Sequence, residues 1–259
     1  MHSNVHQAIQ VAFTREADLY EQVRSSYPTE VVDFIKSLSN ETPDIVVDLG
    51  AGTGKLTRLL GPLNARELIA IEPVAGMREH LKNIPIITKI LDGTAEKLPL
   101  DDHTVDILCC AEAFHWFATH SALAEFHRVL KPNGRLVLIW NSDRQTDKQW
   151  RLNIKKYIQS FRPPETINYR GMEWKKAFDD QKYFSTLEEN QFKNFQKITR
   201  DLAIKRALSI SFIAALPAEE RTKVAEHIQE ILNNAEEIRG MDEFDMEHIS
   251  NVYWCSALP

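Results

Sequence analysis

The chain has 259 residues, of which 43% are hydrophobic and 26% are charged, and 31 Lys and Arg against 37 Asp and Glu give a formal charge of -6. This composition is that of an ordinary globular protein and excludes collagen-like, disulfide-scaffold and disordered chains, while the acidic balance argues against a nucleic-acid partner. Apolar runs fall short of the roughly 20 residues that span a bilayer, and the first residues lack a secretory-signal pattern. We therefore expect a cytoplasmic protein without a membrane partner.

Short β-branched runs alternate with segments of helical period from about residue 29 to residue 140. This alternation predicts a mainly parallel sheet covered by helices on both faces. The run DIVVDLG is apolar almost throughout, as in a central parallel strand that is buried on both sides. Strands are expected at 44–50, 67–73, 84–92, 104–114 and 135–141, and helices at 29–40, 54–61, 75–83 and 121–134.

The pattern changes after residue 141. An irregular stretch at 162–174 is rich in aromatic and turn residues, which favours a lid or a substrate-shaping insertion over about 145–185. We expect one domain over residues 1–259, because two late strands joined by helices could complete the same sheet. These late elements are a helix at 147–161, a strand or strand pair at 185–199, helices at 200–216 and 217–234, and a strand at 246–258.

The three cysteines lie in apolar runs, Cys109 and Cys110 in one predicted strand and Cys255 in another. Their spacing fits neither a disulfide framework nor a zinc site, and the histidines show no metal-ligand spacing. We predict buried, reduced thiols and no bound metal.

The glycine-rich run after the first strand, VVDLGAGTGKLTRLL, has three possible ligands. A phosphate-binding loop would need glycine where Leu49 stands and Ser or Thr where Leu56 follows Lys55. The dinucleotide fingerprint would need its third glycine at position 55, whereas this chain has it at Gly54. The run therefore does not fit a phosphate-binding loop. A nicotinamide-dependent oxidoreductase stays open as a less favoured alternative.

The run Asp48-Leu-Gly50-Ala-Gly52-Thr-Gly54 resembles the loop that ends the first strand of class I S-adenosylmethionine-dependent methyltransferases. The loop of that family passes close to the methionine part of the cofactor, where side chains would collide with it, and glycine also permits the turn. The resemblance implies an α/β, Rossmann-like fold with a seven-stranded, mostly parallel sheet, a late antiparallel strand and S-adenosyl-L-methionine as cofactor. The cofactor contacts that it implies here are Asp48, Gly50, Ala51 and Gly52.

An acidic residue follows the second predicted strand, as it does in this family. Glu72 stands 22 residues after Gly50, and a carboxylate there can accept hydrogen bonds from both ribose hydroxyls. The family resemblance also places Met77 on the adenine face, although a core role for Met77 is equally open. The segment DGTAEKLPL is similar to one that contacts the adenine edge, with Thr94 where the family usually has Asp. The further contacts implied are Thr94, Ala95, Glu96, Ala111 and Glu112.

A narrower resemblance, to the trans-aconitate methyltransferase-like and methyltransferase type 11 subgroup, is carried by AFTREADLYEQVRSSYP, AFHWF and LKPNGRLVLIWNSD. It implies that about residues 1–28 cover the cofactor, with Tyr20 and Arg24 one turn apart and folded over it. Arg24 could pair with the cofactor carboxylate or with an acidic substrate. A solvated helix face is the alternative for Arg24.

Methyl transfer from a sulfonium is an in-line displacement that needs alignment and exclusion of water but no obligatory acid or base. His115 follows the fourth strand, at the edge where ligands bind, and is our candidate catalytic base; it could instead wall the pocket with Trp116 and orient the substrate. Trp140 and Asn141 follow the fifth strand at the same edge of the sheet, which we call the rim. We predict a methyltransferase for a small carboxylate, phenol or quinone-like acceptor. A non-catalytic cofactor-binding protein is a further alternative, and the oligomeric state stays open.

Overall fold

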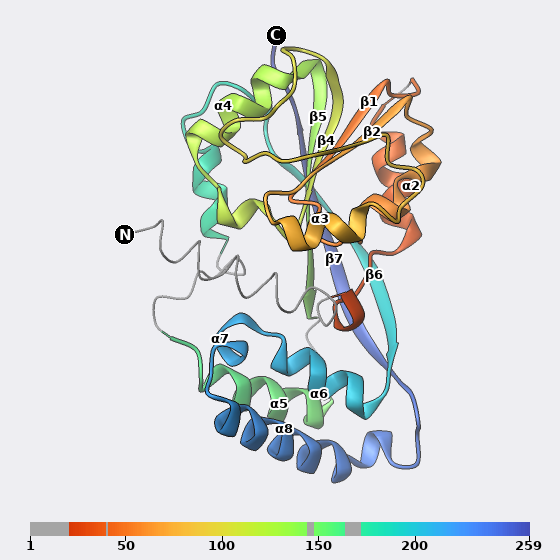
Figure 1. Ribbon diagram of the computed structural model, residues 1–259, viewed down its shortest axis with the longest axis vertical. Coiled ribbons are helices and arrows are strands. Elements are labelled where there is room, and N and C mark those ends of the chain that lie inside the picture. The colour runs from red at the N-terminus through yellow and green to blue at the C-terminus, as the bar shows by residue number, and fades with distance from the viewer. Residues whose placement is uncertain (1–20, 40, 144–147, 164–171) are drawn as a thin grey trace. The chain divides into compact units, whose positions relative to one another are not determined.

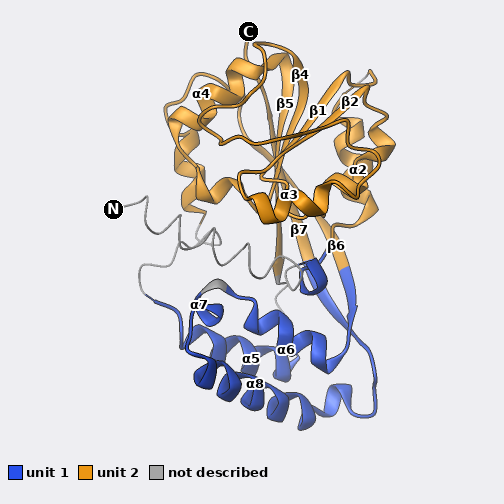
Figure 2. Ribbon diagram, in the orientation of Figure 1, with its two compact units in different colours: residues 1–25, 143–166, 195–248 blue, residues 26–142, 167–194, 249–259 orange. Residues whose placement is uncertain are grey.

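The computed structural model describes residues 21–39, 41–143, 148–163 and 172–259. The chain forms two compact units (Figure 2). We call residues 26–142, 167–194 and 249–259 the sheet unit, and residues 1–25, 143–166 and 195–248 the helical unit. The expected single domain, with its covering segment at 1–28 and its lid at 145–185, stays a prediction.

Seven strands form one sheet in the order β3-β2-β1-β4-β5-β7-β6 (Figure 1). β1 pairs in parallel with β2 and β4, β2 with β3, and β4 with β5. The strand order therefore reverses between β1 and β4, and in such sheets ligands bind outside the carboxyl ends of the strands at that point. The strands are β1 (Ile45–Leu49), β2 (Glu67–Ile71), β3 (Lys89–Leu91), β4 (Val105–Ala111), β5 (Leu130–Asp143), β6 (Glu188–Ile198) and β7 (Phe244–Ser256).

The last strand runs antiparallel to β5. The backbone N–H of Ala257 donates to the carbonyl of Gly134, and that of Asn133 donates to Ala257. Eight residues further along β5, the hydroxyl of Ser142 donates to the carbonyl of Ile249 at 3.4 Å. Residue numbers thus rise along one strand while they fall along the other. The sheet is mixed, and the expected seven-stranded Rossmann-like fold with a late antiparallel strand is confirmed.

Two helical layers cover the sheet, because alternate strand residues face opposite sides. Helix α2 (Thr29–Ser37) packs on the face that includes Val46 and Ile107. Helix α4 (His120–Val129) packs on the face that includes Val47 and Leu108. Figure 1 shows these helices on opposite sides of the strands.

The three cysteines, Cys109, Cys110 and Cys255, are buried and form no disulfide.

Three expected elements of the sheet unit are different in the structure. The helix expected at 121–134 ends at Val129, and residues 130–134 belong to β5 instead. In place of the helix expected at 54–61 the chain forms two 3₁₀ turns, η1 (Thr57–Leu59) and η2 (Gly61–Leu63). An α-helix does not continue past residue 61, because Pro62 has no N–H and its ring would clash with the carbonyl four residues earlier. The strand expected at 84–92 is reduced to β3, since Ile84 and Ile87 bond into turns instead. Helix α3 (Ala75–Leu81) lies close to its expected range.

The helical unit has a hydrophobic core of its own, formed by residues that include Trp150, Ala203 and Ile228. The helix expected at 200–216 is divided after Leu208, where the hydroxyl of Ser209 donates to the carbonyl of Arg206 at 2.8 Å and so competes with helical bonding. The helices of this unit are α5 (Gln149–Gln159), α6 (Arg200–Leu208), α7 (Ser211–Ala214) and α8 (Ala218–Asn233). None of the helices in the described part of the chain is long and apolar enough to cross a membrane.

Candidate active site

Three glycines with positive φ shape the loop that follows β1. Gly50, Gly52 and Gly54 have φ of 69°, 57° and 89°, a region that side chains disfavour. A Cβ on Gly50 would stand 2.7 Å from the Cβ of Ala113, which follows β4. A Cβ on Gly52 would stand 3.7 Å from the sulfur of Met77 on α3. The glycines therefore allow the loop to approach both β4 and α3 closely.

Glu72 ties this loop to the end of β2. Its Oε2 accepts a hydrogen bond from the backbone N–H of Gly52 at 2.9 Å, and its Oε1 accepts one from the N–H of Val74 at 2.8 Å. The side chain is buried, and burial raises the pKa of the carboxyl group. A carboxylate has about four lone-pair sites, so each oxygen keeps a second site for a ligand hydroxyl. The sequence predicted the carboxylate at this edge but not its bonds to the loop.

Asp48 is the last polar residue of β1, and its side chain is 1% exposed. The hydroxyl of Thr57 donates to Oδ2 at 2.5 Å, whereas Oδ1 is buried and has no hydrogen-bond partner among the described residues. Burial, with a smaller effect of the Glu72 charge, raises the pKa of Asp48 to about 7. A buried carboxyl oxygen without a partner is costly, so Oδ1 is suited to a hydrogen bond with a polar group of a ligand.

The loops after β4 and β5 are joined by Glu112. This residue has φ of 53°, an uncommon conformation for a side chain other than glycine. Its N–H donates to the carbonyl of Ile139 at 2.8 Å, and its Oε1 accepts from the N–H of Asn141 at 2.6 Å. Such local strain is often found at functional sites.

An aromatic group stands on the same rim. The indole N–H of Trp140 donates to Nδ1 of His115 at 3.1 Å, and the rings of His115 and Trp116 lie 4.9 Å apart. Trp140 stacks on Trp174 with centroids 4.5 Å apart and planes inclined by 26°. His115 belongs to the 3₁₀ turn η3 (Phe114–Trp116), and burial lowers its pKa to about 4. Three of the four predicted pocket residues, His115, Trp116 and Trp140, therefore lie together.

The fourth, Asn141, has its side chain engaged by neighbouring segments. Its amide group donates to the carbonyl of Ser26 at 3.1 Å. Its amide oxygen accepts from Ser250 at 2.6 Å and from Asn194 at 3.2 Å. These bonds give Asn141 a structural role at the rim, and its contact with a substrate stays a prediction.

The predicted adenine-binding residues lie near the ends of β2 and β3. Met77 and Ala95 are buried, whereas Thr94 and Glu96 are exposed. A Cβ on Gly93 would stand 3.0 Å from Ile71, the last residue of β2, which places the 94–96 loop beside that strand end. Of the other predicted contacts, Ala51 is buried in the glycine loop and Ala111 ends β4.

For two predicted residues, the structure does not test membership of this group. Tyr20 lies outside the described residues. Arg24 belongs to the helical unit, where its guanidinium donates to the carbonyl of Ser209 at 3.4 Å. Their contact with the cofactor stays a prediction.

Sequence reasoning missed Thr57, Asn194 and Ser250. Thr57, whose hydroxyl donates to Asp48, lies in a 3₁₀ turn that was not expected. The other two come from strands whose register the sequence does not fix. Trp174 was noticeable as an aromatic residue, but its stacking on Trp140 was not predictable.

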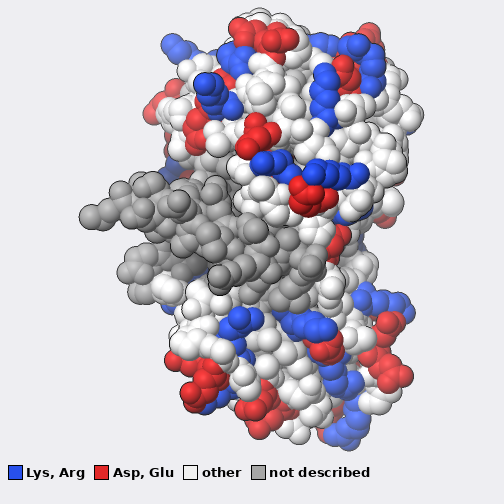
Figure 3. Space-filling model, in the orientation of Figure 1, with Lys and Arg blue, Asp and Glu red and all other residues white. Residues whose placement is uncertain are grey.

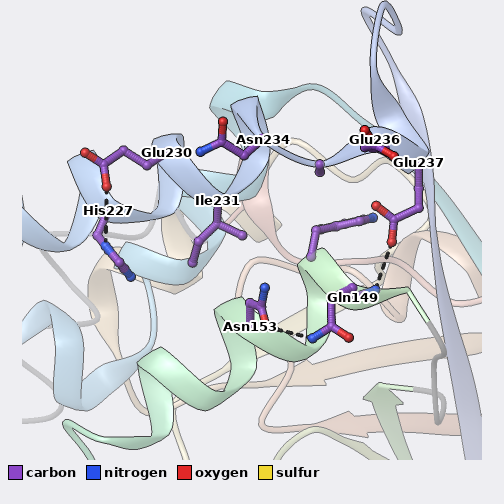
Figure 4. Close-up of a pocket in the computed structure, with 10 residues that line it drawn as sticks. Gln149, Asn153, His227, Glu230, Ile231, Asn234, Glu236 and Glu237 are labelled. Carbon is purple, nitrogen blue, oxygen red and sulfur yellow. Dashed lines mark hydrogen bonds and ion pairs between the residues drawn. The ribbon is translucent and has the colours of Figure 1, made fainter.

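A shallow depression of about 560 Å³ lies on the helical unit (Figure 4). Amide and acidic side chains line it together with Trp150, His227 and Ile231. Glu237 accepts a hydrogen bond from the N–H of Gln149 at 2.9 Å at the start of α5. It contains none of the predicted site residues. Within the described ranges, no three His, Cys, Asp or Glu side chains are grouped to hold a metal.

Comparison with known proteins identifies the family. A family profile described as a methyltransferase domain matches residues 47–138, which include the glycine loop, Glu72 and His115. An uncharacterized methyltransferase-like protein of Schizosaccharomyces pombe is 32% identical over 88% of each chain. The malonyl-[acyl-carrier protein] O-methyltransferase of Yersinia pestis is 28% identical over 62% of each chain. A putative type II methyltransferase structure from Anaeromyxobacter dehalogenans superposes with a TM-score of 0.71 at 18% identity, covering 91% of this chain and 99% of that one. The chain therefore belongs to the class I S-adenosylmethionine-dependent methyltransferases.

Proposed function

We propose that the sheet unit binds S-adenosyl-L-methionine at the carboxyl ends of β1, β2 and β4 and transfers its methyl group to a small metabolite. The observation that carries the proposal is the position of Glu72. Its carboxylate fixes the glycine loop through Gly52 at 2.9 Å and keeps acceptor capacity for ribose hydroxyls. The donor supplies a methyl group already activated by the positive charge of its sulfur.

The residues around the loop suit such a cofactor. Gly50 and Gly52 present backbone without side chains, so a ligand can approach closely. The buried Oδ1 of Asp48, which has no hydrogen-bond partner among the described residues, adds a polar group for the ligand. Asp48, Gly50, Ala51, Gly52 and Glu72 would hold the methionine and ribose parts, with Met77 and residues 94–96 beside the adenine.

The acceptor that fits the rim best is a carboxylate, a phenol or a quinone-like molecule. The half-buried His115 and Trp116 lie over the buried Trp140 and form an aromatic group with one imidazole, which suits small planar molecules. The Yersinia pestis relative, named as an O-methyltransferase of a malonyl group, supports oxygen as the acceptor atom. On the face drawn in Figure 3, Lys and Arg are interspersed with Asp and Glu, which favours a small molecule over a polyanion. We also propose that the protein acts in the cytoplasm.

The test is incubation of the protein with S-adenosylmethionine labelled in the methyl group and a metabolite extract. We expect label in the small-molecule fraction and binding heat when S-adenosylhomocysteine is titrated in. Label in protein or RNA would overturn the substrate class. Absence of binding heat would overturn the cofactor assignment, and binding heat without any transferred label would indicate a binding protein without catalysis.

A further inference from the structure

Strand β6 lies at one edge of the sheet, beside β7 and with no further strand next to it among the described residues (Figure 1). An edge strand presents backbone N–H and C=O groups to which another strand can add. With 11 residues, β6 is about twice as long as a mean strand. Residues 188–191 are all exposed, so both faces of the strand are accessible at this end. β6 is therefore a long edge that is open to pairing.

Alternate side chains of β6 face the core and the solvent. Asn194 is buried, whereas Lys193 and Phe195 on either side of it are exposed. Successive side chains of a strand point to opposite faces, so the odd-numbered residues share the exposed face. In chain order this face carries Glu189, Gln191, Lys193 and Phe195. Phe195 is 57% exposed, the highest fraction among the exposed large hydrophobic side chains of the described residues.

The order of these side chains is complementary to itself when the strand is reversed. If two copies of β6 pair antiparallel about a two-fold axis at Gln191, Glu189 of each copy lies opposite Lys193 of the other. The same register sets Phe195 opposite Leu187. Opposite charges directly across an antiparallel pair are favourable, and like charges are unfavourable. An axis at Glu189 or at Lys193 would set that residue against itself, so charge selects the axis at Gln191.

The present contacts of this face leave the complementary charges available. Lys193 has no ion pair among the described residues. Glu189 pairs with Lys175 at 3.3 Å, but these side chains are 59% and 39% exposed, and such surface pairs contribute little. The amide nitrogen of Gln191 donates to Asn251 of β7 at 3.0 Å, which holds this side chain at the centre of the face. Charges on an edge strand often prevent pairing, whereas their order here favours a second copy of the same strand.

We propose that the protein forms a homodimer in which residues 188–194 of β6 pair antiparallel about a two-fold axis at Gln191. All seven residues belong to the sheet unit. The two sheets then continue into one another, and each copy contributes the same patch to the interface. The assembly closes after two copies, because no free β6 edge is left. This inference is independent of the proposed methyl transfer.

The first test places a cysteine on the proposed axis. Gln191→Cys sets two thiols opposite each other, and directly opposed residues of an antiparallel pair have Cα atoms about 4.5–5.5 Å apart, within the range of a disulfide. Oxidised glutathione should therefore link two chains, as read by non-reducing electrophoresis. Glu188→Cys is the control, because its counterpart lies far along the paired strand, and the native cysteines are buried. Absence of linkage in Gln191→Cys, or equal linkage in both variants, overturns the proposal.

The second test measures association of the full chain by sedimentation equilibrium. Wild type should form dimers as its concentration is raised. Glu189→Lys and Lys193→Glu should each weaken association at least tenfold, because each replaces two attractive pairs by two repulsive ones. The variant with both changes restores opposite charges and should associate as wild type does. Glu188→Lys makes the same change of charge on the other face and should retain association.

A wild type that stays monomeric at every concentration overturns the proposal. A double variant that associates no better than the single variants overturns it as well. Equal weakening by Glu188→Lys would show that net charge, and not the register, controls association, which also contradicts the proposed pairing. The substituted side chains are exposed, and thermal unfolding of each variant checks that it is folded.

Discussion

Ala113 occupies the space that a side chain on Gly50 would need. Its Cβ lies 2.7 Å from the position of a Cβ on Gly50, closer than real side chains approach one another. The loops that follow β1 and β4 therefore touch, which brings the glycine loop next to the turn that carries His115. The missing side chain at Gly50 serves the packing of two loops as well as the approach of a cofactor.

Gly50→Ala is expected to lower the free energy of unfolding by more than Gly240→Ala does. Both glycines have positive φ, 69° and 72°, but a Cβ on Gly240 meets nothing within 4 Å. The backbone conformation alone costs about 1–2 kcal/mol, and overpacking adds about 1–3 kcal/mol at Gly50. Urea unfolding of the two variants measures the difference. Equal losses of unfolding free energy in the two variants would show that the protein relieves the contact with Ala113 at no cost in stability.

Asp48→Asn is expected to flatten the dependence of stability on pH. The folded protein holds the Asp48 proton up to a pKa of about 7, whereas the ordinary pKa of an aspartate side chain is 3.8. Between these values the folded state binds more protons than the unfolded state, so stability falls as pH rises. Each pKa unit corresponds to about 1.4 kcal/mol. Asp48→Asn has no carboxyl group at this position and does not lose stability in this way. Relative to wild type, it should therefore become more stable as the pH rises toward 7.

The measurement is urea unfolding at several pH values between about 4 and 8, the interval set by the two pKa values. Asp101→Asn, at an exposed position, is the matched control and should follow the wild-type curve. Parallel curves for wild type and Asp48→Asn would contradict the buried, protonated state of Asp48.

Trp174→Ala is expected to destabilise the protein by about 3–5 kcal/mol, because it empties a buried aromatic site. Trp254→Ala, which removes a half-buried indole on the other face of the sheet, should cost less. The near-ultraviolet circular dichroism of the stacked Trp140 and Trp174 should also be lost. An unchanged spectrum in Trp174→Ala would argue against the stack that holds Trp140 on His115.

Much of the fold was predictable because it follows from local patterns. Apolar strands that alternate with helical segments predicted the parallel sheet, and the resemblance supplied the late antiparallel strand. The 3₁₀ turns after the glycine loop were not predicted, although Pro62 is the reason that an α-helix does not continue there. The spacing of apolar residues alone does not show this.

The sequence could predict which strand each residue of the candidate site follows, but not the contacts between these residues. His115 and Trp140 both follow parallel strands, so their placement on one rim could be expected. Their hydrogen bond depends on the orientation of two rings, which the sequence does not contain. Likewise, Asn141 was expected at the rim, but its partners Asn194 and Ser250 come from strands 53 and 109 residues away.

The most direct test of the account is calorimetric titration of S-adenosylhomocysteine into wild type, Glu72→Gln and Glu67→Gln. Glu67 begins the same strand and pairs with Lys89 at 2.6 Å, at the opposite end from the glycine loop. An amide at position 72 cannot accept from Gly52, Val74 and the ribose as a carboxylate can, so affinity should fall at least tenfold. Thermal unfolding of the ligand-free variants shows whether the loop itself is weakened.

We expect wild type and Glu67→Gln to bind with equal affinity and Glu72→Gln to bind at least tenfold more weakly. Equal affinity in all three proteins, or no binding by the wild type, would contradict the central claim that Glu72 and the glycine loop hold the cofactor.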